Sequence, residues 1–331
     1  MGEDVNRHAY RGRPYAQMSL SAPKPAVLKT VQLASPITRV VIFVNPIAGS
    51  GKGHQTAERL QKHLLAANIQ AQTIYGAPES APTEQLTGSE AIITIGGDGT
   101  LRAAVQRCMD VLGQVPPVLP VPLGTANLMC RHLGIDWAPP SFTHHILLSL
   151  QRGTISYLDV AEANGQLFLL MVGVGLDGSV VHELDRIRGA RINFASYLLP
   201  AAMALTNYRY PPIDVRIDGK EIFACAPALA FIGNVKEYGT GFPLLPEAQP
   251  DDGLLDVCVI PIKSPVELIQ KFIRVAAGEH LLEEGVVYAR GHNITVNSTT
   301  PIPIQLDGDP GGHTPVLINL LPVRVPFIVP A

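Results

Sequence analysis

The sequence lacks the features that mark a secreted, membrane-spanning or nucleic-acid-binding protein. No apolar run in its 331 residues approaches the roughly 18 residues that a membrane-spanning helix needs. The first residues contain no apolar stretch of the kind that a signal peptide has. The 25 Lys and Arg residues are balanced by 28 Asp and Glu residues, so no overall positive charge attracts nucleic acid. We expect any contact with a membrane to be made from the surface.

Cysteine is also scarce, and the four cysteines are scattered along the chain. The four cysteines are Cys108, Cys130, Cys225 and Cys258, and no two of them form a C-x-x-C pair. A disulfide framework and a zinc site are therefore not expected, and the cysteines are interpreted as reduced core thiols in a cytoplasmic protein. The apolar content of 47% indicates a globular protein, and the length suits two domains.

One stretch, residues 92–101, combines a buried strand with a glycine-rich turn. Ile92–Ile95 has the β-branched composition of a parallel strand, the turn reads Gly-Gly-Asp-Gly-Thr, and Thr100–Leu112 has helical spacing. Strand, glycine turn and helix start together form a common phosphate site in α/β proteins. Asp98 within that turn needs a magnesium ion or a hydroxyl proton to offset its charge. A tight turn with Asp98 as a helix cap is the structural alternative.

A second glycine-rich turn follows the apolar run Val40–Val44. It begins with Asn45 and Pro46 and continues to Lys52 and Gly53, where a helix starts. The turn is not a P-loop, because proline occupies the place of the first glycine and glycine follows the lysine. It suits a second phosphate-facing loop, with a solvated flexible loop as the alternative.

A third unit of the same kind begins with a short strand from Val118. Its turn carries Gly124, Thr125 and Asn127, and we expect the next helix to start at Thr125. The carboxyl ends of neighbouring parallel strands meet at one edge of a sheet, where α/β proteins bind ligands. Three turns at one edge predict a nucleotide site.

The pattern changes near Leu158, where short strands begin to dominate. They predict a mostly antiparallel second domain, with Phe168–Val172 as one strand, a hairpin turn at Asp218-Gly219, and helices over about 184–206 and 264–275. The polar, proline-punctuated residues 1–37 are expected to form a flexible arm.

The ordered motifs carry a family resemblance between about Val40 and Pro326. The chain resembles the diacylglycerol kinase catalytic-domain family, which includes bacterial lipid kinases and sphingosine kinases. The motifs are the Asn45-Pro46 turn with Gly49, Gly51, Lys52 and Gly53; Gly96-Gly97-Asp98-Gly99-Thr100; Pro122-x-Gly124-Thr125-x-Asn127; Gly173-x-Gly175-x-Asp177; Gly239-x-Gly241 with Pro246-x-Ala248 and Asp251-Asp252-Gly253; and Asp307-Gly308-Asp309.

The resemblance implies an ATP- and Mg²⁺-dependent lipid kinase of lipid metabolism, working at the inner membrane surface. Its fold would be α/β plus β, with a nucleotide-binding α/β domain over 38–155, rejoined by 317–331. A β-sandwich lipid-substrate domain would cover 156–316, and the active site would lie in the cleft between the two domains. The acceptor would be diacylglycerol or a related lipid, and the sequence leaves the oligomeric state open.

The resemblance also implies roles for single residues. Asp307 is the candidate general base, and Asp98 lies near magnesium, although a role near the hydroxyl is also open for it. Asp177 would contact the substrate head group, with a helix cap as the alternative. Arg188, in a cluster with Arg186 and Arg191, would grip a phosphate or an anionic lipid, or lie on a solvated face. The residues expected to line ATP are Asn45, Pro46, Lys52, Gly96, Gly97, Gly99, Thr100, Gly124, Thr125, Asn127 and Arg188.

A second, structural magnesium is implied at the acidic turn before the strand that begins at Leu255. The Asp252 carboxylate and the carbonyls of Gln249 and Leu254 would hold it, since oxygen ligands of this mixed type suit magnesium. An exposed acidic turn without metal is the alternative.

The sequence departs from the family pattern at one point that bears on the chemistry. Asp309 stands where the family has glutamate in its last motif. Two other functions stay open: a soluble-metabolite kinase of the NAD kinase type, and a non-catalytic nucleotide- or lipid-binding module.

Overall fold

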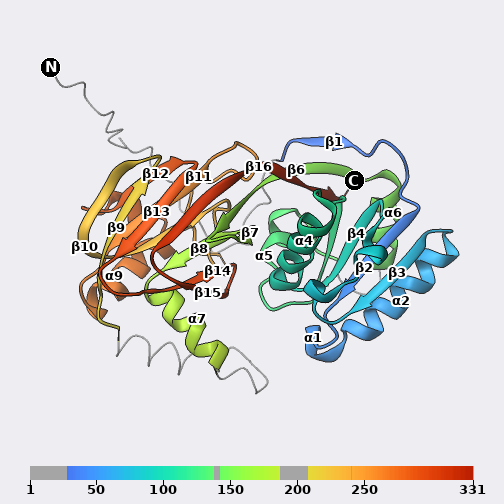
Figure 1. Ribbon diagram of the computed structural model, residues 1–331, viewed down its shortest axis with the longest axis horizontal. Coiled ribbons are helices and arrows are strands. Elements are labelled where there is room, and N and C mark those ends of the chain that lie inside the picture. The colour runs from blue at the N-terminus through green and yellow to red at the C-terminus, as the bar shows by residue number, and fades with distance from the viewer. Residues whose placement is uncertain (1–27, 138–141, 187–207, 240, 331) are drawn as a thin grey trace.

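The computed structural model describes residues 28–137, 142–186, 208–239 and 241–330 and contains two domains side by side (Figure 1). An α/β domain is followed by a β-sandwich, so the expected fold class is confirmed. Arg188, Arg191, most of the helix expected over about 184–206, and residues 1–27 of the expected arm lie outside the described residues.

The N-terminal domain is built on parallel strands in the order β3-β2-β4-β5. The inner strands are apolar on both faces and almost fully buried, as expected for a sheet covered by helices on both sides. The last strand of the chain joins this sheet, because Phe327 pairs in parallel with Val118. The bounds are β2 (Arg39–Val44), β3 (Gln70–Tyr75), β4 (Ala91–Gly96), β5 (Val118–Pro122) and β16 (Val316–Val329).

Helices cover both faces of this sheet (Figure 1). Helix α2 buries Ala57, Leu60 and Leu64, which share one helix face, and packs with α6 on one side of the sheet. Helix α4 buries Leu101 and Val105 on the other side, together with α5. The bounds are α1 (Ala48–Gly51), α2 (Gly53–Ala66), η1 (Pro78–Ser80), α3 (Thr83–Leu86), α4 (Asp98–Leu112), α5 (Leu128–His132) and α6 (Phe142–Arg152).

The C-terminal domain is a sandwich of two antiparallel sheets around a separate apolar core. The long strand β10 belongs to both sheets: its first half pairs with β9 and its second half with β8 and β11. The hairpin at Asp218-Gly219 forms between β9 and β10, with positive φ at both residues, as the sequence predicts. The bounds are β6 (Thr154–Ala163), β7 (Gln166–Phe168), β8 (Met171–Val174), α7 (Leu176–Arg186), β9 (Pro212–Ile217), β10 (Lys220–Gly233), β11 (Leu255–Pro261), α9 (Pro265–Ala276), η2 (His280–Leu282), β12 (Val287–Gly291), β13 (Asn293–Ser298), β14 (Pro303–Leu306) and β15 (Asp309–His313).

Strands β6 and β16 run antiparallel through both domains and tie them together (Figure 1). The end of the expected arm is also part of the fold. Residues Thr30–Gln32 form β1, which pairs with β6, and Ile37 is buried. The expectation of a flexible arm is therefore wrong for residues 28–37.

Three element bounds differ from the sequence-based expectation. Helix α5 begins at Leu128 rather than Thr125, because Asn127 adopts a left-handed conformation (φ 47°) that ends the turn. Helix α7 begins at Leu176, directly after Gly175, rather than near residue 184. The single strand expected over Phe168–Val172 is broken between β7 and β8. The break leaves backbone N–H groups for another partner, which lies in the site described below.

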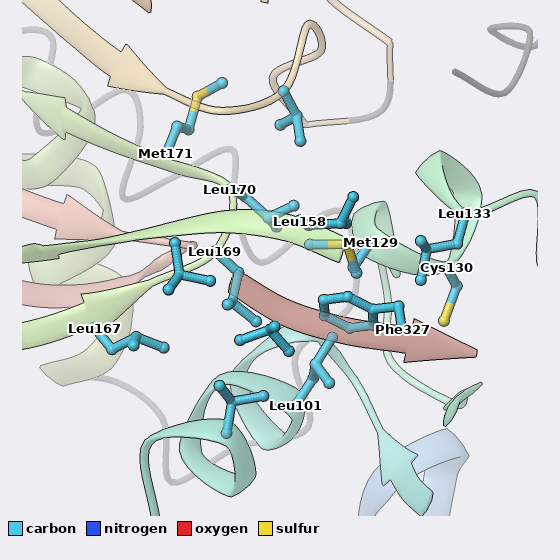
Figure 2. Close-up of a cluster of buried hydrophobic side chains, with 14 of the residues drawn as sticks. Leu101, Met129, Cys130, Leu133, Leu158, Leu167, Leu169, Leu170, Met171 and Phe327 are labelled. Carbon is cyan, nitrogen blue, oxygen red and sulfur yellow. The ribbon is translucent and has the colours of Figure 1, made fainter. Parts of the chain in front are cut away.

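An apolar cluster continues from the N-terminal domain into the sandwich. Figure 2 shows Leu101 of α4, Met129 of α5 and Phe327 of β16 gathered with leucines of the β7–β8 segment. These buried contacts hold the β7–β8 segment against α4, so the two domains share part of one core.

The structure also bears on the expected state of the cysteines and on membrane-spanning helices. All four cysteines are free thiols, and three are buried, whereas Cys225 is exposed and is therefore not a core thiol. In the described parts of the chain, no helix has the length and apolar character to cross a membrane.

Candidate active site in the cleft between the domains

Three glycine-bearing turns lie at the carboxyl ends of adjacent strands, as the sequence predicts. They follow β2, β4 and β5, which are neighbours in the parallel sheet. The turns span residues 45–53, 96–100 and 122–127. Their shared edge places backbone N–H groups and the start of α4 in one region, which suits a phosphate-bearing ligand.

The first turn is shaped by Asn45. Its Oδ1 accepts a hydrogen bond of 3.2 Å from the N–H of Ile47, and its carbonyl packs directly on Gly53. Any side chain at Gly53 would collide with that carbonyl, so glycine is needed where α2 begins. Pro46 is half-buried, and Lys52 is exposed at the end of the turn. An exposed lysine beside a glycine turn is free to turn toward an anion.

The second and third turns pack back to back. A Cβ on Gly124 would lie 2.5 Å from the Cα of Gly97, so both positions need glycine. Asn127 closes the third turn through two hydrogen bonds with the backbone of Gly124, of 2.8 Å and 2.9 Å. Thr125 is exposed at its tip, and Thr100 folds back over Gly96. The residues expected to line ATP thus lie on three turns at one edge of the sheet, except Arg188, which lies outside the described residues.

The carboxylate of Asp98 joins the second turn to α5. Its Oδ2 accepts from the N–H of Leu128 (2.9 Å) and its Oδ1 from the N–H of Met129 (3.1 Å). Burial raises the pKa of Asp98, the hydrogen bonds from Leu128 and Met129 oppose that shift, and the charge of Asp309 adds to it. Asp98 thus fixes two of the ligand-facing turns relative to each other.

Asp307 is held by the broken segment between β7 and β8. Its Oδ2 accepts from the N–H of Leu169 (2.8 Å), and its Oδ1 accepts from Leu170 (2.8 Å) and Met171 (3.0 Å). Burial raises the pKa of Asp307 to about 6, against these hydrogen bonds and the nearby charge of Arg102. The carboxylate is therefore an acceptor for backbone groups that the strand break leaves unpaired.

Asp309 reaches the second glycine turn from the opposite domain. Its Oδ2 lies 2.8 Å from Nη2 of Arg102 on α4, and a Cβ on Gly99 would lie 2.9 Å from the same oxygen. Sequence reasoning noted Asp309 only as a departure from the family pattern and assigned it no role. Its position two residues after Asp307, on the same turn, was the signal that could have identified it.

A cavity of about 550 Å³ lies in the sandwich domain between α7 and α9. Its walls are almost entirely apolar, and Asp177 supplies the one carboxylate among the residues described there. Tyr238 donates a hydrogen bond to Oδ1 of Asp177. Burial raises the pKa of Asp177 to about 6, opposed by hydrogen bonds from Tyr238 and Gln305. The lining residues are Leu176, Asp177, Val180, Leu229, Phe231, Tyr238, Phe242, Leu268, Ile269, Phe272, Ile273 and Ala276.

Gln305 connects this cavity to the turn that carries Asp307 and Asp309. Its Nε2 lies beside Asp177, and both groups close over Gly173. Its Oε1 accepts a 2.7 Å hydrogen bond from the N–H of Gly308, between Asp307 and Asp309. The side chain is buried, with 1% exposure. A chain of contacts therefore runs from the cavity carboxylate to the turn that faces Gly99.

The acidic turn near Asp252 does not provide the expected magnesium ligands. Arg290 pairs with Oδ2 of Asp252, and the N–H of Leu254 donates to Oδ1 at 3.1 Å. Arg290 also lies 3.3 Å from the buried carboxylate of Asp256. The guanidinium supplies the positive charge that an ion would bring to Asp252, so this pairing favours an acidic turn without metal over the site expected at Asp252, Gln249 and Leu254. Among the described residues there is also no cluster of three or more His, Cys, Asp and Glu side chains able to hold a metal.

Comparisons with known proteins agree with this arrangement. Residues 39–163 match the family model for a diacylglycerol kinase catalytic domain, and residues 170–329 match that for a YegS C-terminal NAD kinase beta sandwich-like domain. A probable lipid kinase YegS-like from Pseudomonas aeruginosa is 30% identical over 67% of this chain and 71% of its own length. A diacylglycerol kinase from Bacillus subtilis is 25% identical over 84% of this chain and 91% of its own.

The fold has a close counterpart among solved structures. A putative diacylglycerol kinase from Bacillus anthracis superposes with a TM-score of 0.69 and 25% identity, covering 88% of this chain and 97% of its own. The two-domain arrangement thus extends over nearly the whole of that relative. Together with the motifs at the cleft, these similarities show that the chain belongs to the diacylglycerol kinase family of lipid kinases.

Proposed function

We propose that the protein transfers a phosphoryl group from Mg²⁺-ATP to the hydroxyl group of diacylglycerol or a related lipid. One observation carries this proposal: an apolar cavity with a single carboxylate, Asp177, connects through Gln305 to the turn that lies against Gly99. An apolar chain suits the cavity, and a polar head group suits Asp177. The reacting hydroxyl would then lie toward the cleft.

The three turns at the sheet edge are the proposed nucleotide site. Glycines at positions 96, 97, 99 and 124 would let phosphate oxygens approach the backbone closely. Helix α4 begins among them, and its first N–H groups have no partner within the helix. Asn45, Pro46, Thr100, Thr125 and Asn127 would border the nucleotide. Lys52 would add a point charge, and Arg188 is proposed with them from the sequence alone.

Magnesium is proposed as the partner of the ATP phosphates rather than as an ion held in a cage of protein ligands. When bound, it would neutralise charge on the phosphates that are transferred. Mg²⁺ in kinases is often held by one or two carboxylates together with phosphates and water. Asp98 and Asp309 are the carboxylates at the second turn. They are close enough for the charge of Asp309 to raise the pKa of Asp98.

The proton of the lipid hydroxyl needs an acceptor at the cleft. Asp307 was expected to fill this role, but three backbone N–H groups already occupy its carboxylate. We therefore give Asp307 a positioning role, in which it holds the β7–β8 segment and fixes the turn. Asp309 is proposed as the proton acceptor, because its carboxylate extends to Gly99, where the transferred phosphate would lie. Arg102 would hold the Asp309 side chain in place.

A lipid substrate implies that the enzyme works at a membrane surface. We propose a cytoplasmic protein that associates peripherally with the inner membrane surface, where both ATP and the lipid are present. This location follows from the proposed substrate.

The experiment that tests the function offers labelled ATP with diacylglycerol, sphingosine, NAD or no acceptor. Label is expected in a lipid product, and only when magnesium is present. Val180→Trp should fill the cavity and raise KM for the lipid while leaving KM for ATP unchanged. Val323→Trp, at a half-exposed position of β16 outside the cavity lining, is the matched control. Transfer to NAD alone would contradict the proposal.

A further inference from the structure

Helix α9 exposes a stripe of large apolar side chains on the sandwich domain. Val266, Ile269 and Ile273 are 65%, 59% and 63% exposed, and Phe272 is 41% exposed. These positions recur at three- and four-residue spacing and lie on one side of the helix. Leu268 and Val275 are buried beside the stripe and anchor the helix to the core. Phe272 also contacts the ring of Phe242, so the strongly exposed Val266, Ile269 and Ile273 are the positions that contribute least to holding α9 in the fold.

The stripe continues into the cavity that we assign to the lipid. Ile269, Phe272 and Ile273 are exposed to solvent and also line the cavity. Only Val266, at the first turn of the helix, is exposed without lining it. In Figure 1, α9 and α7 both lie along the lower side of the sandwich. The mouth of the cavity and the apolar stripe thus form one surface.

The charges around the stripe indicate how this surface would bind. Lys271 lies 2.8 Å from Glu283, and Arg274 lies 2.5 Å from Glu279. Arg274 is also 3.1 Å from Glu283. Because these cations are already paired with carboxylates, they offer little excess positive charge to anionic lipid head groups. Binding at this surface would depend on apolar contact.

We propose that α9 is the membrane-docking helix of the protein. It lies in the surface of a bilayer with Val266, Ile269, Phe272 and Ile273 among the acyl chains, as amphipathic interfacial helices do. In that position the cavity opens directly onto the lipid, so a substrate molecule enters without crossing water. The assignment of the cavity rests on the proposed function, whereas docking itself requires neither ATP nor catalysis. A protein partner would instead recognise the stripe without any response to lipid.

A tryptophan placed on the stripe tests the proposal directly. Val266→Trp and the matched control Leu65→Trp change residues of similar exposure, 65% and 59%, in different domains. Vesicles of brominated phosphatidylcholine should quench the fluorescence of Val266→Trp beyond the signal of wild-type Trp137, and should leave Leu65→Trp at the wild-type level. Quenching should change little between low and high salt. Equal quenching of both variants, or quenching of neither, would overturn the docking assignment.

A charge on the stripe gives a second, quantitative measurement. Val266→Asp should lower the partition coefficient onto phosphatidylcholine vesicles by about tenfold or more, since one apolar side chain can no longer be buried. Aspartate is favourable in the first turn of a helix, so the fold should be retained. Leu65→Asp should change the partition coefficient by less than about twofold. Unchanged partition of Val266→Asp would contradict the proposal.

Activity measurements separate this proposal from the proposed function. Val266→Asp should phosphorylate a short-chain lipid dispersed as monomers at the wild-type rate, and long-chain lipid in vesicles more slowly. Val266→Trp protein that is quenched by vesicles but phosphorylates no lipid would contradict the proposed function and leave docking intact. Val266→Trp protein that is active on dispersed lipid but not quenched by vesicles would contradict docking alone.

Discussion

Arg102 and Asp309 form a 2.8 Å ion pair between the two domains, and it joins helix α4 to the sandwich domain. Both side chains are mostly buried, with exposures of 20% and 25%. The carboxylate also lies over Gly99, in the turn that we propose as part of the nucleotide site. This contact gives Asp309 a defined orientation, which a proton acceptor requires.

We expect Asp309→Asn to lose activity while retaining the fold. Removal of a positioned proton acceptor typically lowers kcat by about 10²–10⁴-fold. Asparagine has nearly the same shape and can still accept from Arg102, so the Tm should change little. Steady-state kinetics with the lipid acceptor checks this. Near-normal kcat in folded Asp309→Asn would remove this residue from proton transfer.

Asp307→Asn should show the opposite pattern, with a loss of stability as its main effect. An amide in place of the carboxylate can no longer accept all three N–H groups of residues 169–171, and a buried donor left without a partner costs about 1–3 kcal/mol. Urea unfolding should show that decrease, and amide exchange at Leu169 and Leu170 should become faster. A stable Asp307→Asn protein with abolished kcat would instead support the original assignment of Asp307 as the base.

The sequence predicted the three ligand-facing turns well, because each depends on local rules. A buried strand, a glycine turn and an amphipathic helix follow one another within about twenty residues, and parallel strands bring such turns to one edge. The turns at Asn45, Gly97 and Gly124 therefore lie together as expected.

The roles of the acidic residues could not be predicted in the same way, because they depend on partners far away in the chain. The Asp307 carboxylate is occupied by backbone groups 136–138 residues away, which a break in an apparently continuous strand leaves unpaired. Asp252, in the turn before β11, is paired with Arg290 of β12. The family resemblance implied a base and a metal ligand, but only the fold determines which oxygens already have donors.

The raised pKa of Asp177 predicts a specific dependence of stability on pH. Its pKa is about 6 in the folded protein and near the ordinary 3.8 in the unfolded chain, so the folded state binds the proton more tightly between these values. The free energy of unfolding should therefore fall as the pH rises from about 4 to about 6, by roughly 2–3 kcal/mol for this group. Asp177→Asn should remove that part of the decrease.

Asp307 contributes a decrease of the same direction, since its pKa is also raised to about 6. Part of the decrease in the free energy of unfolding should therefore remain in Asp177→Asn. Urea unfolding of both proteins at intervals between pH 4 and pH 7 gives the comparison. A wild-type free energy that rises over this interval, or identical slopes in both proteins, would contradict the assigned pKa of Asp177.

The pairing of Asp252 with Arg290 predicts that the acidic turn is stable without magnesium. The guanidinium contacts Asp252 and Asp256, and Asp256 also accepts a 2.6 Å hydrogen bond from Tyr288. A ligand that binds only the folded state would raise the Tm with its concentration, and we expect no such rise at this turn.

Asp252→Ala should leave Arg290 without one partner and lower the Tm by the same amount in magnesium and in chelator. Arg290→Gln should lower it as well, because Asp256 then stays buried with less compensation for its charge. Thermal unfolding of the three proteins, each in magnesium and in chelator without ATP, makes the test. A Tm that rises with magnesium in the wild type but not in Asp252→Ala would show that an ion, rather than Arg290, stabilises this turn.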